Sequence, residues 1–273
     1  VGERISIITS KAQTTRHRFR AVLTRDDFQL ILVDTPGIHK PHDALGEELN
    51  ESALKGLQDI DVAAMVIDAS QPIGRGDEWV AKQVAACKAR RICVLSKTDI
   101  ATPEQIAAQR EAAEALMTWD AMVTLSARSG ANVDAFVEEA VFFLPEGPAW
   151  FPPDMQTDQP MEVVIAEFIR EKILRSFHDE VPHSIGVAVD NMQYEKKKDL
   201  QRIFATIYVE RDSQKGMIIG KKGAAIKRIG SEARADLEQL LGCRVFLDLN
   251  VKVKKNWRRD ATQIRRFGYG EGA

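Results

Sequence analysis

The sequence lacks several features that define large classes of proteins. Its three cysteines, Cys87, Cys93 and Cys243, are scattered and have no metal-ligand spacing, which argues against a cysteine zinc site and indicates reduced cytosolic thiols. No apolar run approaches the length needed to cross a bilayer, so the sequence excludes an integral membrane protein. No low-complexity tract is present, and 44% hydrophobic with 29% charged residues is typical of a globular protein.

A glycine-rich phosphate loop, G-x-x-x-x-G-K-[ST], is also absent from the 273 residues. Its absence conflicts with the stretch VDTPGIHKP (33–41), because DTPG after an apolar run is typical of nucleotide-hydrolysing switch proteins. Such proteins place this motif near Mg²⁺ and the γ-phosphate, and they need the phosphate loop as well. Either the motif is a coincidence, or the loop precedes Val1.

Charge is distributed unevenly although the net charge is only −2. Residues 1–159 hold 16 Lys and Arg against 24 Asp and Glu, a balance of −8, whereas residues 160–273 hold 22 against 16, a balance of +6. Between Lys215 and Arg266 there are 14 basic and 5 acidic residues. A basic second half indicates a polyanionic partner, with a merely solvated basic face as the alternative.

Short β-branched runs alternate with helical patterns in the first half of the chain. The pattern predicts buried strands at 29–34, 61–70, 90–99 and 121–127, and helices at 76–89, 103–117 and 132–144. Such alternation predicts an α/β fold with a mostly parallel sheet and helices on both faces. Ligand-binding residues of this architecture lie at the carboxyl ends of the strands. DTPG (34–37), SKTD (96–99) and SAR (126–128) all fall there.

A proline-rich stretch divides the chain in two. LPEGPAWFPPDMQTDQP (144–160) holds five of the ten prolines and predicts a linker. We therefore predict a nucleotide domain at 1–146, a linker at 147–160 and a second domain at 161–273. The second domain begins with an amphipathic helix, continues with a hairpin whose polar turn is YEKKKDL (194–200), and has two helices flanking GKKG before a last strand.

The SKTD motif predicts selectivity for guanine. A carboxylate at Asp99 accepts from N1–H and from the exocyclic amine of guanine, and adenine offers neither donor in that arrangement. Lys97 lays its aliphatic stem across the base plane, and Thr98 completes the loop. Ser96 stands where the motif usually has Asn, so we expect a weaker site. A solvated turn is the alternative for four residues taken alone.

The remaining nucleotide motifs follow in the order of a GTPase. Asp34 is predicted to hold Mg²⁺ through water and the Gly37 N–H to face the γ-phosphate, while Ser126 and Ala127 offer backbone N–H groups to the base. The other residues of the motif at 34–38 are Thr35, Pro36 and Ile38. The stretch QTTR is predicted to be the switch I loop and to present the Thr15 hydroxyl to Mg²⁺; it comprises Gln13, Thr14, Thr15 and Arg16. An ordinary polar loop is the alternative for QTTR.

The stretch MIIGKKGAAIKRIGSEARADLEQLLG (217–242) resembles the signature of a KH domain. A G-x-x-G loop between two helices lets a nucleic-acid strand approach, because Gly220 and Gly223 have no Cβ, and the lysines between them meet phosphates. VKVKKNWRRD (251–260) adds basic charge, with Trp257 as a stacking or, more in keeping with a single Trp, a packing ring. The predicted RNA-binding residues are Ile219, Gly220, Lys221, Lys222, Gly223, Lys227, Lys254 and Lys255.

Three stretches make the resemblance specific: ITSKAQTTRHRFRAVLT (8–24), VDTPGIHKP (33–41) and LGEELNESALKGLQDID (45–61). With them the chain resembles, from residue 1 to Gly272, the Era family of bacterial ribosome-assembly GTPases. The resemblance implies a P-loop GTPase-type domain whose first strand, phosphate loop and most of the first helix precede Val1, followed by an α+β KH domain of type II. It also implies slow hydrolysis, since Ile38 stands where related proteins place a water-orienting Gln, and we assign no catalytic residue.

The resemblance further implies the cofactor Mg²⁺, with GTP as substrate and GDP as product. The implied partners are the 3′ end of 16S rRNA and the 30S ribosomal subunit, in whose assembly a cytoplasmic, monomeric switch takes part, with peripheral association at the inner membrane. The 273 residues by themselves are expected to be inactive in hydrolysis. A catalytically inactive KH-domain adaptor is the alternative, favoured by Ser96 and by the missing loop. A paralogous GTPase with two nucleotide domains is disfavoured by the single set of motifs.

Overall fold

The computed structural model describes residues 5–9, 14–37, 43–177, 184–267 and 269, and the chain forms two compact units. The first unit comprises Val1–Leu23, Ile31–Ser52 and Met155–Ala273, and the second comprises Thr24–Leu30 and Ala53–Asp154. No helix among the described residues is long and apolar enough to cross a membrane. Two of the predicted site residues, Gln13 and Ile38, lie outside the described residues.

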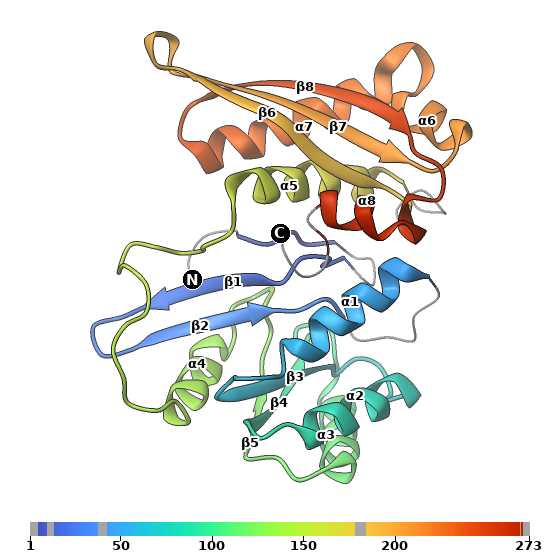
Figure 1. Ribbon diagram of the computed structural model, residues 1–273. Coiled ribbons are helices and arrows are strands. Elements are labelled where there is room, and N and C mark those ends of the chain that lie inside the picture. The colour runs from blue at the N-terminus through green and yellow to red at the C-terminus, as the bar shows by residue number, and fades with distance from the viewer. Residues whose placement is uncertain (1–4, 10–13, 38–42, 178–183, 268, 270–273) are drawn as a thin grey trace. The chain divides into compact units, whose positions relative to one another are not determined.

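The second unit contains a parallel sheet with the strand order β3 (Val62–Asp68), β4 (Arg90–Ser96) and β5 (Ala121–Thr124). The helices of this unit are α2 (Arg75–Ala86), α3 (Pro103–Leu116) and α4 (Val133–Phe142). The central strand β4 is buried on both faces. Cys93 and Leu95 share a core with residues of α2 and α3. Ile92 and Val94, which alternate with them and so face the other side of the sheet, are buried as well. In Figure 1, α4 lies on the opposite side of this sheet from α2 and α3.

Parallel pairing places the ends of these three strands at one edge. Asp68 at the end of β3 is opposite Ser96 at the end of β4, and Leu95 is opposite Thr124 at the end of β5. The loops that follow therefore begin side by side, which is the arrangement that the alternation of strands and helices predicts.

The first unit contains a second sheet, in the order β6 (Gly186–Glu195), β7 (Leu200–Val209) and β8 (Arg244–Val253). The β6–β7 pair is an antiparallel hairpin and the β7–β8 pair is parallel. The hairpin turn is narrower than the predicted polar segment, since it is confined to residues 196–199. The helices are α5 (Met161–Ser176), α6 (Asp212–Ile219), α7 (Ala224–Leu241) and α8 (Ala261–Arg266).

Helix α5 is buried on all sides, so that no residue from Val164 to Leu174 is exposed. Its apolar residues share one core with the sheet β6–β7–β8 and with α7. The same core includes Ile5, Ile7 and Phe19 from the beginning of the chain. Figure 1 shows α5 between the sheet and these first residues. The two sets of residues are far apart in sequence and bury each other's apolar surface.

Three elements were not predicted from the sequence: β1 (Phe19–Thr24), α1 (Ala44–Lys55) and α8. Strand β1 pairs with β2 (Gln29–Asp34) in a two-stranded sheet. Helix α1 starts where the Asp43 carboxylate accepts the Gly46 N–H at 2.9 Å. Leu45 and Leu49, one turn apart on α1, are buried against aromatic residues of the C-terminal segment. This capping residue and spacing were the signals that could have revealed the helix.

Candidate nucleotide and RNA sites

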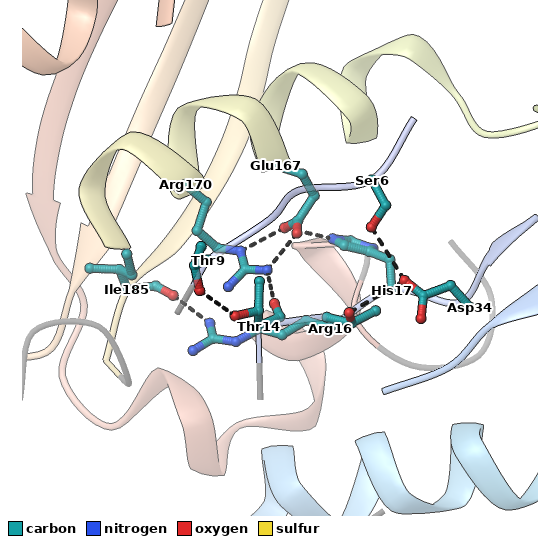
Figure 2. A network of polar contacts seen from close by, with 10 residues as sticks. Ser6, Thr9, Thr14, Arg16, His17, Asp34, Glu167, Arg170 and Ile185 are labelled. Atoms are coloured by element: carbon teal, nitrogen blue, oxygen red, sulfur yellow. Dashed lines mark hydrogen bonds and ion pairs between the residues drawn. The ribbon is translucent and has the colours of Figure 1, made fainter. Parts of the chain in front are cut away.

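Asp34, at the end of β2, faces two hydroxyl groups. Its Oδ2 accepts from Ser6 Oγ at 3.2 Å and from Thr15 Oγ1 at 3.4 Å. Figure 2 shows the side chains of Ser6 and Asp34 turned toward each other. The Asp34 side chain reaches solvent, yet the protein packed around it desolvates the carboxylate and raises its pKa, against the lowering effect of the two hydroxyl bonds. The negative charge of Glu167 adds to the increase.

This arrangement fits a magnesium ion. Mg²⁺ prefers oxygen ligands, keeps several waters and is usually held by one or two carboxylates together with substrate phosphates. Asp34 and Thr15 place one carboxylate and one hydroxyl group 3.4 Å apart, and both are oxygen ligands of the kind that Mg²⁺ binds. A nearby cation would also offset the cost of desolvating the Asp34 carboxylate. Among the residues that the structure describes, no group of three or more His, Cys, Asp or Glu is placed to hold a metal ion.

The remaining residues of the DTPG motif differ in their exposure to solvent. Pro36 is buried and anchors the turn after Thr35, whereas Gly37 is exposed. A Cβ built on Gly37 meets no atom within 4 Å.

The SKTD loop is held by a contact that the sequence did not reveal. Lys97 Nζ lies 2.6 Å from Asp68 Oδ2, so the ends of β3 and β4 are joined by an ion pair. Burial raises the pKa of Asp68 somewhat, but hydrogen bonds from Lys97 and Ser70 hold it below its usual range. Lys97 has φ +62°, a left-handed conformation that turns the chain sharply after the strand. Asp68 is itself a strand-end carboxylate, and that position is the signal by which it could have been found.

Asp99 is braced by the next loop. Ser126 Oγ donates to Asp99 Oδ1 at 2.7 Å, and the Thr98 N–H donates to the Leu125 carbonyl at 3.3 Å. Ser126 is buried, and its own N–H donates to the Ala131 carbonyl at 3.0 Å. The Ser126 N–H, which is predicted to meet the base, thus donates to the Ala131 carbonyl in this structure, while the Ser126 hydroxyl contacts Asp99. Ala127, the next residue, is exposed.

The GKKG loop has the backbone that its glycines predict. Gly220 has φ +72°, Lys222 has φ +52° and Gly223 has φ +78°. A Cβ on Gly220 would lie 2.7 Å from Ala225 Cβ and 2.9 Å from its backbone nitrogen, so only glycine fits between α6 and α7. Lys221 and Lys222 are both exposed at this turn.

The other predicted RNA-binding residues lie on the elements around this loop. Ile219 is the last residue of α6 and half-buried, and Lys227 is exposed on the first turns of α7. Lys254 and Lys255 are exposed directly after β8, where the Lys254 N–H donates to the Val209 carbonyl. Trp257 is fully buried and donates its Nε1–H to the Ser184 carbonyl at 2.9 Å, so it is a packing ring.

A buried charged cluster in the first unit was missed by sequence reasoning. On α5, Arg170 Nε donates to Glu167 Oε1 at 2.7 Å, and Glu167 Oε1 lies 3.5 Å from His17 Nε2. Burial alone would raise the pKa of Glu167, but the charge of Arg170 and hydrogen bonds from His17 and Arg170 hold it at about 2. No local sequence pattern brings residue 17 to residue 167.

This cluster predicts how stability depends on pH. Because the pKa of Glu167 is depressed in the folded protein, its ion pair stabilises the protein above the ordinary carboxyl pKa, and the stabilisation is lost as the pH falls toward 2. We expect Glu167→Gln to cost about 3 kcal/mol at pH 7, the usual effect of breaking a buried pair. Denaturant unfolding at pH 7 and pH 3 measures this, and an equal cost at both values would contradict it.

Comparison with known proteins was informative for both halves of the chain. A family model described as 50S ribosome-binding GTPase matches residues 1–97, and a KH domain model matches residues 180–258. The crystal structure of Era Y63A from Aquifex aeolicus bound to GDP·AlF4⁻ has 36% identity and a TM-score of 0.95, and the match covers 99% of this chain and 92% of that one.

A second solved structure is Era in complex with MgGDPNP and nucleotides 1506–1542 of 16S ribosomal RNA. It has 36% identity and a TM-score of 0.93, again over 99% of this chain and 92% of that one. Both matches extend through the nucleotide motifs and the GKKG loop alike. They confirm the fold class predicted from the sequence, a GTPase-type α/β fold followed by a KH domain.

Proposed function

Because the chain belongs to the Era family of GTPases with a KH domain, we propose that it is a GTP-dependent switch that binds ribosomal RNA. The observation that carries the proposal is the match, over 99% of this chain, to an Era structure that holds MgGDPNP and an rRNA segment together. The match extends over both halves of this chain, which supports a site for each ligand. The family's cofactors are Mg²⁺ and guanine nucleotides.

The nucleotide half of the proposal rests on two groups of residues. Asp34, through water, and Thr15 would hold Mg²⁺, which neutralises charge on the phosphates when bound, and Gly37 would present its N–H to the γ-phosphate. The guanine-binding loop would be Ser96–Asp99, with Asp99 oriented by the Ser126 hydroxyl. We propose that the backbone of Ala127 completes the base pocket.

The RNA half rests on the GKKG loop. Its positive-φ backbone and two exposed lysines suit a phosphate backbone that passes close to the chain. Lys227, Lys254 and Lys255 would extend this basic surface. We propose that the target is the 3′ end of 16S rRNA and that binding serves assembly of the 30S subunit. The proposal includes the division 1–146, 147–160 and 161–273, a cytoplasmic monomer and peripheral contact with the inner membrane.

A catalytically inactive RNA-binding adaptor is the second candidate function. It is favoured by Ser96 in place of the usual Asn, and by the absence of a G-x-x-x-x-G-K-[ST] motif from the 273 residues. The braced geometry of Asp99 favours nucleotide binding instead, since an adaptor would gain nothing from a carboxylate fixed by two loops.

The variant Asp99→Asn distinguishes these functions. An amide at this position keeps only one of the two acceptor oxygens, so it cannot accept from both the guanine N1–H and the amine, but its NH2 can donate to the 2-oxo group of xanthine. We expect selectivity for GDP over XDP to change by about 100-fold, in keeping with the loss of a buried bidentate hydrogen bond. Competition against a fluorescent guanine nucleotide measures it. Ser126→Ala is the control that loosens Asp99 without changing its chemistry, and equal affinity of the wild-type protein for GDP and ADP would refute the assignment.

A further inference from the structure

The segment Thr14–His17, which overlaps the predicted switch I loop, is fastened to α5 at its first residue. Arg170 Nη2 donates to the Thr14 carbonyl and, at 2.5 Å, to Glu167 Oε2. Arg170 Nε donates to the other oxygen of Glu167. One guanidinium thus bridges the backbone of the segment and a carboxylate of the helix, and Figure 2 shows Arg170 lying between them.

The same segment is fastened at its other end. Arg16 Nη1 donates to the Ile185 carbonyl at 2.6 Å, and its guanidinium carbon lies 5.4 Å from the Tyr269 ring and 6.0 Å from the Trp257 ring. Burial lowers the pKa of Arg16. His17 follows, with its Nε2 3.5 Å from Glu167. The partners of Arg16 and His17 are thus Ile185, just before β6, Trp257 and Tyr269, after β8, and Glu167 on α5.

Between the two anchors lies Thr15, the residue whose hydroxyl is 3.4 Å from Asp34. Thr14 and Arg16 are both fixed, so the place of the Thr15 hydroxyl is decided by the contacts of its neighbours. The Glu167 charge also reaches Asp34, where it contributes to the raised pKa of that carboxyl. Helix α5 therefore acts on both of the oxygens proposed to face the metal.

We propose that Glu167 and Arg170 are positioning residues of the nucleotide site, which hold Thr14–His17 on α5 and so make the place of Thr15 depend on the RNA-binding domain. This inference rests on the proposed function. A nucleotide that draws Thr15 elsewhere must break the Arg170–Thr14 contact and uncover Arg16. By thermodynamic linkage, if RNA binding shifts α5 and thereby changes the affinity for the nucleotide, nucleotide binding changes the affinity for RNA by the same factor.

A purely structural role accounts less well for these residues. Replacing a buried ion pair by apolar side chains of similar volume is often neutral or stabilising, so a core has no need of one. The cluster joins a guanidinium, a carboxylate, an imidazole and a backbone carbonyl across 150 residues of sequence or more. Hydrogen-bond and ion-pair networks that join distant segments are the kind of contact through which two sites are coupled.

Trypsin cleavage of the Arg16–His17 bond in the 273-residue chain tests the inference. Arg16 is only 5% exposed, so the bond is cut only when the segment leaves α5. We expect Glu167→Gln to raise the initial rate of cleavage by at least about ten-fold, and Arg170→Lys, which keeps the charge but cannot bridge both partners, to give a smaller increase. The mass of the N-terminal fragment separates this cut from cleavage at the exposed Arg18.

The matched control is Lys172→Met on the same helix. Lys172 is equally buried, but its ammonium pairs with Asp236 on α7 and not with the segment. We expect this variant to lower the melting temperature without faster cleavage at Arg16. Equal acceleration in Lys172→Met and Glu167→Gln, compared at equal distance below their melting temperatures, would overturn the inference, as would unchanged cleavage in Glu167→Gln.

A second arm tests the dependence on RNA. Adding an RNA of nucleotides 1506–1542 of 16S rRNA should change the cleavage rate of the wild-type chain at least three-fold, and should not change it in Glu167→Gln, which keeps the GKKG loop. RNA that binds without altering cleavage in the wild type would overturn the inference. If the RNA does not bind at all, the proposed function fails, and the comparison of Glu167→Gln with Lys172→Met still decides the role of the cluster.

Discussion

Replacing Lys221 and Lys222 together with Asp is expected to lower RNA affinity about 1,000-fold at physiological salt. The two lysines are exposed side chains of the GKKG turn, whose glycines have positive φ. Each lysine that neutralises a phosphate releases a counterion, and an aspartate in its place adds repulsion. The slope of log affinity against log salt should fall by about two in consequence.

The fold should survive this double substitution. Both side chains are solvent-exposed, and neither takes part in the core shared by α5, α7 and the sheet. The measurement is a fluorescence-anisotropy titration with a 16S rRNA fragment at several salt concentrations. Lys196→Asp with Lys197→Asp is the matched control, because these exposed lysines at the β6–β7 turn give the same change of charge outside the GKKG loop. Equal losses in the two double variants would mean that only total charge matters.

The loops whose positions the sequence predicted are those set by local backbone. Strand-end loops could be placed because parallel strands bring their carboxyl ends to one edge, and GKKG could be placed because its conformation needs glycine at Gly220. The contacts that escaped prediction are long-range. The Lys97–Asp68 pair joins residues 29 apart, and the Arg170–Thr14 contact joins residues 156 apart. No periodicity or motif encodes which distant side chains meet.

Helix α5 shows the same limit in another way. Its amphipathic pattern predicts a helix with one buried face, yet the helix is buried all round because Ile5, Ile7 and Phe19 cover the face that would otherwise meet solvent. From the sequence alone, the charges of Glu167 and Arg170 predict an exposed face of the helix. In the structure both side chains are buried and form an ion pair with each other. Tertiary packing decided these environments, and local composition did not.

The second large effect concerns hydrolysis. Residues 1–273 assayed alone are expected to release phosphate from GTP at least about 1,000-fold more slowly than the same chain fused behind a strand, phosphate loop and helix of the P-loop GTPase type. In P-loop GTPases the loop backbone and its Lys cradle the β- and γ-phosphates, and its Ser/Thr holds Mg²⁺. Preorganised donors of this kind supply most of the electrostatic stabilisation of the transition state.

The residues that the 273-residue chain does offer cannot take over that role. In the proposed function Asp34 and Thr15, 3.4 Å apart, would face one side of the metal. Gly37 would offer one N–H to the γ-phosphate, and Asp99 would contact only the base. Phosphate release and RNA anisotropy are measured on one preparation, so that retained RNA binding shows a folded protein. Asp34→Ala in the fused protein is the control that should abolish the restored turnover. Comparable rates with and without the added segment would show that phosphate-binding groups exist among residues 1–273 themselves.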